Sequence, residues 1–333
     1  MSNFKLYIIL IMIFSSSVFA DENNKFNLIN PPQNHISEDG IVSIVISANH
    51  NNVDYLKITT NIDEINVNIN SKRTTYCESI ELSLGINNIL ISGYKDEKIV
   101  KEEVANVYVS SKVYKDYKYP PDKFDKKYFH TEEKEKICSQ CHDMSNNEVN
   151  GVAFTDVSDS NCYQCHNKIV KKKYAHAPAV NWLCTSCHNS DVGMHNLYDK
   201  GKSKFIAPDP ISLRCFSCHK ELKSEWEQKR FIHEPTDSGR CNKCHNPHAS
   251  NNPNYLRIPV WKLCTSCHKD KINDSHVVKT FSNKKHPTRG VNDPSRPGKE
   301  LSCISCHNPH VSNTAYLLES GQTINLCVKC HKK

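Results

Sequence analysis

Methionine, glycine and long apolar runs are scarce in this chain of 333 residues. It contains four methionines and 10 glycines, and only Met144 and Met194 lie beyond residue 20. The longest apolar run, from Leu6 to Phe14, is too short to cross a bilayer as a helix. No other stretch is long and apolar enough, so the sequence predicts no transmembrane segment in the mature chain.

The first 20 residues have the layout of an export signal. Lys5 supplies a positive start, the apolar run follows, and Val18-Phe19-Ala20 forms a small-residue cleavage site. A retained membrane anchor is the alternative. We expect cleavage after residue 20 and an exported protein, located in the periplasm, at the cell surface or outside the cell.

Cysteine is abundant and follows one pattern. Of 17 cysteines, all but Cys77 belong to eight Cys-x-x-Cys-His motifs. Numbered 1 to 8 along the chain, the motifs are Cys138, Cys141 and His142; Cys162, Cys165 and His166; Cys184, Cys187 and His188; Cys215, Cys218 and His219; Cys241, Cys244 and His245; Cys264, Cys267 and His268; Cys303, Cys306 and His307; and Cys327, Cys330 and His331. Two thiols at this spacing can form thioethers with the haem vinyl groups, and the next imidazole becomes the proximal iron ligand. The motifs predict eight covalently bound haem c groups with their iron.

The Cys-x-x-Cys spacing alone also occurs in zinc sites and redox dithiols. A disulfide scaffold is a further alternative for a cysteine-rich exported chain. Histidine accounts for only 18 of 333 residues, yet it follows all eight pairs. We therefore favour haem attachment over zinc or disulfides.

Eight further histidines occur beyond residue 129, which equals the number of motifs. They are His130, His176, His195, His233, His248, His276, His286 and His310. The two remaining histidines, His35 and His50, lie before the motifs. Methionine cannot supply eight second ligands, so we expect each iron to have a distal histidine from this set. His248 and His310 follow a proximal histidine by three residues and are expected to ligate neighbouring haems.

The formal net charge of +7 could indicate nucleic-acid binding. Each haem, however, brings two propionates, which the lysine and arginine excess can offset. We therefore predict no nucleic-acid partner.

Residues 25–111 lack haem motifs and alternate apolar and polar residues. This pattern is clear at Ile41–Ile46, at Ile62–Ile69 and at Val104–Val109, and it predicts a sandwich of roughly seven antiparallel strands. The segment Ile80–Ile91 resembles the leucine, glycine, asparagine and strand signature of bacterial Ig-like modules, which act as spacers, adhesive units or docking surfaces. Cys77 is expected to be a half-buried free thiol, with an intermolecular disulfide as the alternative.

Residues 112–128, rich in tyrosine, proline and lysine, are predicted to be a linker that packs against the haem region. Residues 129–333 contain few apolar side chains, so we expect short helices, long loops and folding that depends on the cofactor. The longest expected helix is Lys220–Arg230, with Leu222 and Trp226 on one face.

The haem region repeats internally in units of two motifs. His130, His176 and His233 each precede a motif by eight residues, and His286 opens the last unit. His245-Asn246-Pro247-His248 recurs as His307-Asn308-Pro309-His310, whereas the first unit has Asp143-Met144 behind His142. Across residues 129–333 this layout resembles the paired-CXXCH multihaem c-type cytochromes, here with eight haems. The expected molecule is thus multidomain, an all-β Ig-like sandwich followed by a haem-organised cytochrome domain.

This resemblance implies an electron carrier with no catalytic residues, whose partners are redox donor and acceptor proteins or an extracellular acceptor. Eight bis-histidine haems would form a low-potential electron conduit. One alternative is a reductase of a small nitrogen or sulfur oxyanion, which needs one open-coordination haem. Another is a conductive homopolymer filament, with His130 or His276 ligating a haem of the next subunit.

Overall fold

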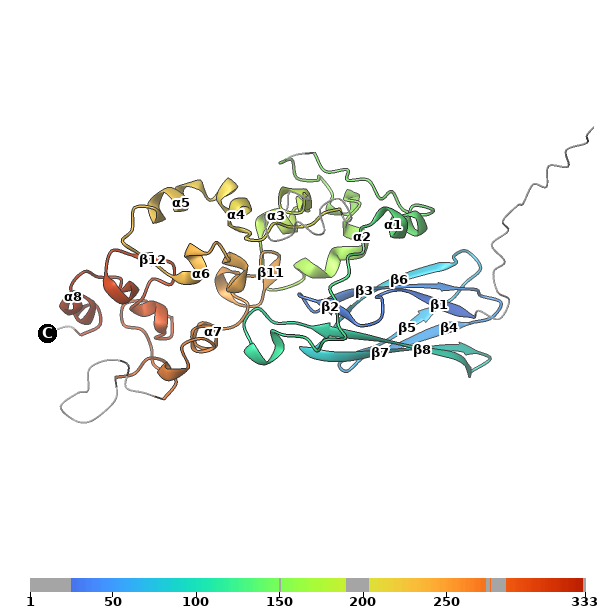
Figure 1. Cartoon of the computed structure of the whole chain (residues 1–333), viewed down its shortest axis with the longest axis horizontal. Coiled ribbons are helices and arrows are strands. Elements are labelled where there is room, and N and C mark those ends of the chain that lie inside the picture. Colours follow the sequence, from blue (N-terminus) through green and yellow to red (C-terminus); the bar gives the residue numbers. More distant parts are fainter. Residues whose placement is uncertain (1–24, 150, 190–203, 274–275, 277–285, 332–333) are drawn as a thin grey trace, which may run out of the picture.

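The computed structural model describes residues 25–149, 151–189, 204–273, 276 and 286–331 (Figure 1). Eight strands form within residues 25–111. They are β1 (Phe26–Asn30), β2 (His35–Ser37), β3 (Ile41–Ala48), β4 (Tyr55–Thr59), β5 (Glu64–Asn68), β6 (Thr75–Glu81), β7 (Gly85–Lys95) and β8 (Lys98–Val109). One sheet has the order β1-β3-β6 and the other β2-β8-β7-β4-β5, with only β2 and β8 pairing in parallel.

The two sheets share one hydrophobic core. Ile44 in β3, Ile80 in β6 and Ile89 in β7 are at most 1% exposed and belong to the same buried cluster. Buried and exposed positions alternate at the start of β7, as expected where successive side chains point to opposite faces. The N-terminal region is therefore β-rich and folds around an ordinary apolar core.

The strands differ in extent from the runs that predicted them. β3 and β8 include the predicted runs, while β5 is shorter than its run. The run Ile80–Ile91 is divided between β6 and β7 by a turn after Glu81, and Gly85, with a φ of +90°, opens β7. The fully buried Asn87 side chain holds this turn by donating to the carbonyl oxygens of Ser83, at 2.8 Å, and Gly85, at 3.0 Å.

The linker packs mainly on the β-rich region, contrary to the prediction, and it touches the haem region where the Lys134 ammonium donates to the Tyr128 carbonyl oxygen at 2.5 Å. Phe124 is 3% exposed, and its ring centre lies 5.7 Å from that of Tyr108 in β8. The ring of Tyr117, in the 3₁₀ turn Lys115–Tyr117, lies against Gly85. Asp125 also forms a parallel bridge with His35 in the edge strand β2, so the linker extends that edge of the sheet.

The haem region consists of short helices, small two-stranded sheets and loops. The α-helices are α1 (Glu132–Cys138), α2 (Tyr163–His166), α3 (Ala177–Val180), α4 (Ser212–Cys218), α5 (Lys220–Trp226), α6 (Glu234–Asp237), α7 (Val260–Thr265) and α8 (Thr323–Val328). The 3₁₀ turns are Val157–Asp159, Asn167–Val170, Cys184–Ser186, Cys241–Lys243, Pro253–Tyr255, Lys269–Lys271, Cys303–Ser305 and Ala315–Leu317. β9 (Tyr174–Ala175) pairs with β11 (Ala249–Ser250), and β10 (Phe231–Ile232) pairs with β12 (Val311–Ser312). The expectation of short helices and little sheet is confirmed.

Few side chains are buried in this region. Among its described residues, the buried apolar side chains are Trp182, Ile206, Ile211, Ala249, Leu301 and Val311. The helix predicted over Lys220–Arg230 adds little to this core. α5 ends at Trp226, four residues before the predicted end, and 40% of Leu222 is exposed. Protein side chains alone thus provide little of a core here.

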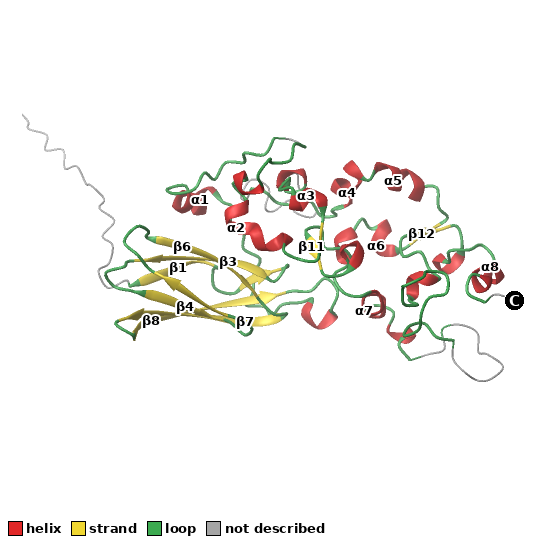
Figure 2. Cartoon of the chain, turned by 180° about the vertical axis from the view of Figure 1, so that it is seen from behind, coloured by secondary structure: helices red, strands yellow, loops and turns green. Residues whose placement is uncertain are grey.

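The molecule is elongated, with the β-rich region toward one end and α8 at the other (Figures 1 and 2). α1 and α2 lie along the β3–β6 sheet, and Ser79 Oγ of β6 donates to the Cys165 carbonyl oxygen at 2.9 Å. From there the chain continues away from the sheets through α3, α4 and α5. Among the described residues, no helix has the length and apolar character to span a membrane.

Candidate haem-binding sites

Every Cys-x-x-Cys-His motif closes one helical turn. In all eight, the backbone N–H of the histidine donates to the carbonyl oxygen of the first cysteine, at 2.8–3.1 Å. Motifs 3, 5 and 7 lie on 3₁₀ turns, whereas the helices α1, α2, α4, α7 and α8 carry the other five. The turn brings two thiols and an imidazole together, which is the donor set that covalent haem attachment requires.

Six of the spare histidines face a motif histidine. The distances between ring centres are 6.1 Å for His130 and His166, 5.9 Å for His188 and His248, 6.2 Å for His233 and His268, 5.9 Å for His245 and His310, 5.7 Å for His276 and His307, and 6.1 Å for His286 and His331. The ring centre of His176 lies 5.2 Å from that of Tyr255, and burial, with a smaller contribution from His219, lowers the pKa of the His176 imidazole. His195 lies outside the described residues.

These spacings fit an iron between the two rings. Bonds from imidazole nitrogen to zinc are about 2.0–2.1 Å, and two similar bonds on opposite sides of a metal put the ring centres roughly 6 Å apart. Within the described residues, no cluster of three or more histidine, cysteine or acidic side chains suits a metal ion. The histidines instead meet in twos, as bis-histidine haem ligation requires.

The two small sheets position four of the spare histidines. His176 follows β9, and its backbone N–H donates to the His248 carbonyl oxygen at 2.9 Å. His233 follows β10 and makes the same 2.9 Å bond to His310. Each sheet therefore joins the histidine that opens one unit, His176 or His233, to the histidine that follows the first motif of the next unit, His248 or His310.

The repeated loops orient the motif histidines His245 and His307. His245 Nδ1 lies 2.7 Å from the Asn254 carbonyl oxygen, and His307 Nδ1 lies 2.7 Å from that of Tyr316. Asn254 and Tyr316 adopt left-handed backbone angles, with φ of 55° and 60°. A hydrogen bond at Nδ1 leaves Nε2 free to bind iron and fixes the ring. Sequence reasoning did not identify these carbonyl partners, because no residue type marks them.

Burial favours the neutral imidazole that binds iron. It lowers the pKa of His166 to about 4, assisted by the nearby His130, and lowers that of His310 to about 4, assisted by His245. Trp226 stacks on His310 with ring centres 4.8 Å apart, a contact that the sequence prediction of a helix face missed.

Thiol contacts link the motifs in chain order. The first cysteines are in hydrogen-bond contact in the pairs Cys162 and Cys184, Cys215 and Cys241, and Cys264 and Cys303. The second cysteines influence a thiol pKa in the pairs Cys187 and Cys218, Cys244 and Cys267, and Cys306 and Cys330, as Cys138 does for Cys165. Motifs that follow one another in sequence are therefore neighbours in space.

Cys77 lies on β6 with an exposed side chain, so it is not half-buried as predicted. Partial loss of water around the sulfur atom nevertheless raises the pKa of the Cys77 thiol to about 11, and the nearby Cys165 and Cys138 add to this effect. The outer face of β6 is therefore next to motifs 1 and 2.

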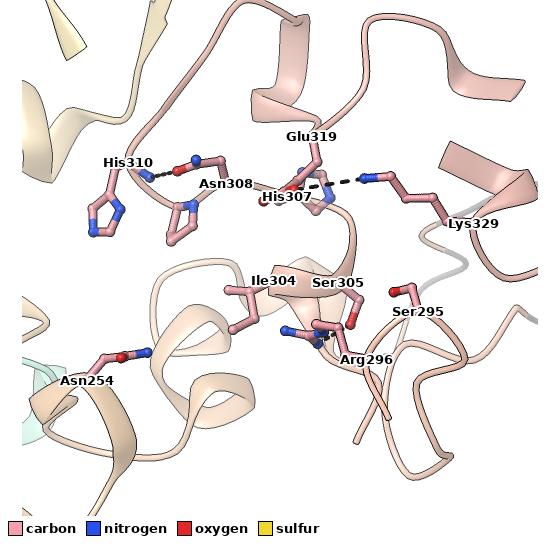
Figure 3. Close-up of a pocket in the computed structure, with 11 residues that line it drawn as sticks. Asn254, Ser295, Arg296, Ile304, Ser305, His307, Asn308, His310, Glu319 and Lys329 are labelled. Atoms are coloured by element: carbon pink, nitrogen blue, oxygen red, sulfur yellow. Dashed lines mark hydrogen bonds and ion pairs between the residues drawn. The ribbon is translucent and has the colours of Figure 1, made fainter. Parts of the chain in front are cut away.

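A cleft of about 700 Å³ opens beside motif 7 (Figure 3). It contains both His307 and His310, which belong to different ring pairs. Arg296, at its wall, is held by the Asp293 carboxylate at 2.6 Å. This volume lies in the range of small-molecule and cofactor pockets.

Two solved structures share limited similarity with the chain. An engineered protein aligns with a TM-score of 0.22 at 4% identity, over 26% of this chain and 20% of its own. An FMN-binding beta-glucuronidase from Facaelibacterium prausnitzii L2-6 aligns with a TM-score of 0.21 at 8% identity, over 30% of this chain and 13% of its own. Neither score bears on the fold.

Sequence comparison is more informative. Residues 233–273 and 296–333 match a family model described as a doubled CXXCH motif. Multiheme cytochrome MtrA of Shewanella baltica (strain OS185) is 26% identical over 188 residues, which cover 51% of each protein, so the chain spans about half the length of this relative. With the motif geometry, these matches support a multihaem c-type cytochrome whose paired motifs bind haem c covalently.

Proposed function

We propose that this protein is exported and carries electrons along eight bis-histidine, low-spin haem c groups. The ring pairs are the observation that carries the proposal, because each supplies both axial ligands of one iron. The similarity to a multihaem cytochrome supports it. Bound haem supplies a one-electron couple, while the chain fixes ligation, spacing and potential.

Six of the proposed distal ligands follow the ring pairs, and His176 is assigned from the influence of His219 on its imidazole pKa. His130 serves motif 2, His248 motif 3, His176 motif 4, His310 motif 5, His233 motif 6, His276 motif 7 and His286 motif 8. His195 is assigned to motif 1, because it is the one spare histidine left for His142. Bis-histidine ligation without methionine gives low potentials, so we expect an electron carrier at the low end of the cytochrome c range.

The thiol contacts support a conduit that follows motif order from 1 to 8. One end lies beside the β-rich region, for which we keep the Ig-like assignment and a role in attachment. The other end lies at α8 (Figure 1). Electron donor and acceptor would then meet opposite ends of an elongated molecule, in the periplasm or outside the cell.

Filament formation is an extension of this proposal. His130 and His276, the two candidates for a ligand shared between subunits, each face a motif histidine of their own chain. A filament would therefore use another contact between subunits.

The ferric holoprotein tests the conduit. Electron paramagnetic resonance at native pH, with haems counted by intact mass, should give eight haems and only low-spin iron. A stoichiometric high-spin signal would contradict the conduit. It would favour the reductase of a small nitrogen or sulfur oxyanion, most directly if replacing His195 left the signal unchanged.

A further inference from the structure

Eight of the histidines assigned to iron have a polar partner at Nδ1, and these partners are of two kinds. Six have a backbone carbonyl oxygen within 3.0 Å: that of Pro247 for His176, Phe205 for His188, Pro309 for His233, Asn254 for His245, Pro287 for His286 and Tyr316 for His307. Two have a carboxylate instead, namely His130 and His248. A carboxylate carries a full negative charge, so these two histidines differ electrostatically from the other six.

Glu135 is the carboxylate at His130. It lies in the last turn of α1, its side chain is 6% exposed, and Oε1 is 3.1 Å from His130 Nδ1. The Lys204 ammonium lies 2.5 Å from Oε2 and balances part of the charge. Because the side chain is buried, solvent does little to screen its effect on the imidazole.

Asp39 is the carboxylate at His248, and it comes from the β-rich region. It lies in the turn between β2 and β3, with Oδ2 3.4 Å from His248 Nδ1. Arg257 is 3.8 Å from Oδ1, and 34% of the Asp39 side chain is exposed. The sandwich therefore contacts a histidine assigned to iron directly.

We propose that Glu135 and Asp39 are positioning residues that lower the reduction potentials of the haems at motifs 2 and 3. The inference rests on the ligand pairs of the proposed function. A carboxylate that accepts the Nδ1 proton increases the basicity of Nε2, which stabilises ferric over ferrous iron. Backbone carbonyls have the same effect more weakly, because they carry only a partial charge.

Motifs 2 and 3 are consecutive, and their first cysteines are in contact. The two carboxylates thus place a low-potential pair of haems where the haem region meets the sandwich. Electrons would reside there for the smallest fraction of the time. The N-terminal region thereby helps to set the potential profile, in addition to any role in attachment.

The test compares Asp39→Asn and Glu135→Gln with Glu38→Gln in the full holoprotein. Glu38 lies in the same turn as Asp39 and loses the same charge, but it pairs with Lys112 and Lys126. Potentiometric titration followed by optical and paramagnetic resonance spectra should show one low-spin haem per variant becoming easier to reduce. We expect about a tenfold change in its ferric-to-ferrous ratio, which is 59 mV for one electron. Glu38→Gln should leave all potentials in place.

Potentials that do not move in Asp39→Asn, or that move equally in Glu38→Gln, would overturn the assignment for Asp39. Restoring the carboxylate with Asp39→Glu should recover the low potential, which a purely structural role does not require. If Glu135→Gln fails to fold, the Asp39 variants still decide the matter at motif 3. Failure of the proposed function appears separately, as high-spin iron in the unmodified protein.

Discussion

At the scale of single residues, the sequence predicted the number of spare histidines but not their partners. In the structure, a histidine that opens a unit faces the second motif of that unit, as His233 faces His268. The histidine behind a first motif faces the first motif of the preceding unit, as His310 faces His245. Local sequence spacing cannot reveal these histidine pairings, because they depend on how the two-motif units dock against one another.

The pairing of His310 with motif 5 can be tested by combining variants. His310→Ala should convert one of the eight haems to high spin. Adding Cys241→Ala and Cys244→Ala, which prevent haem attachment at motif 5, should remove that signal because the open iron is gone. The matched triple variant with Cys303→Ala and Cys306→Ala at motif 7 should retain it. The pairing is wrong if the two combinations behave in the opposite way.

Asn87 should be important for the stability of the β-rich region. Asn87→Ala leaves the half-buried Ser83 backbone N–H and the Ser83 and Gly85 carbonyl oxygens without their Asn87 partner. We expect a loss of about 3 kcal/mol in the free energy of unfolding, measured by amide exchange of the core strands. The exposed neighbour Asn88 provides the control, since Asn88→Ala should cost less than about 0.5 kcal/mol. Equal effects would contradict this role.

At the scale of elements, strands with an apolar core were predictable because their side chains alternate between buried and exposed faces. The small sheets β9–β11 and β10–β12 were not, since each strand has only two residues and pairs with a distant segment. The Lys220–Arg230 helix prediction extended too far for a similar reason. Nothing local marks where Trp226 turns to stack on His310.

The repeated Asn-Pro turn should control ligation at motif 5. Asn308 Oδ1 accepts from the His310 backbone N–H at 3.0 Å, and Asn246 does the same for His248. Asn308→Ala should loosen His310 and produce a partial high-spin signal from a single haem, detectable by paramagnetic resonance. Asn325→Ala, at an exposed position in α8, is the control and should remain fully low-spin. A fully low-spin Asn308→Ala variant would show that the turn does not hold the ligand.

At the scale of the whole molecule, the β-rich region and the haem region fold on different principles. The first has a cluster of buried aliphatic side chains, whereas the second has few buried apolar residues among those described. Composition predicted this contrast, because apolar residues alternate in one part and are sparse in the other. How the regions dock was not predictable, since it depends on single contacts such as Asp39 with His248 and Ser79 with Cys165.

Preventing haem attachment should therefore unfold one region and spare the other. In full-length apoprotein, we expect amides of residues 25–111 to remain protected from hydrogen exchange. Amides of residues 129–331 should exchange as in an unfolded chain, because their core is mostly cofactor. Strong protection around motifs 3 to 6 without haem would contradict this view. Holoprotein supplies the comparison, with protection in both regions.

An experimental structure of the holoprotein that locates every iron tests the central claim most directly. The account predicts eight irons that succeed one another in motif order from the sandwich to α8. Each iron should lie between the proximal and distal histidines assigned here, including His142 and His195 at motif 1. An iron that lacks a second histidine, or an order of irons that departs from the order of the motifs, would contradict it.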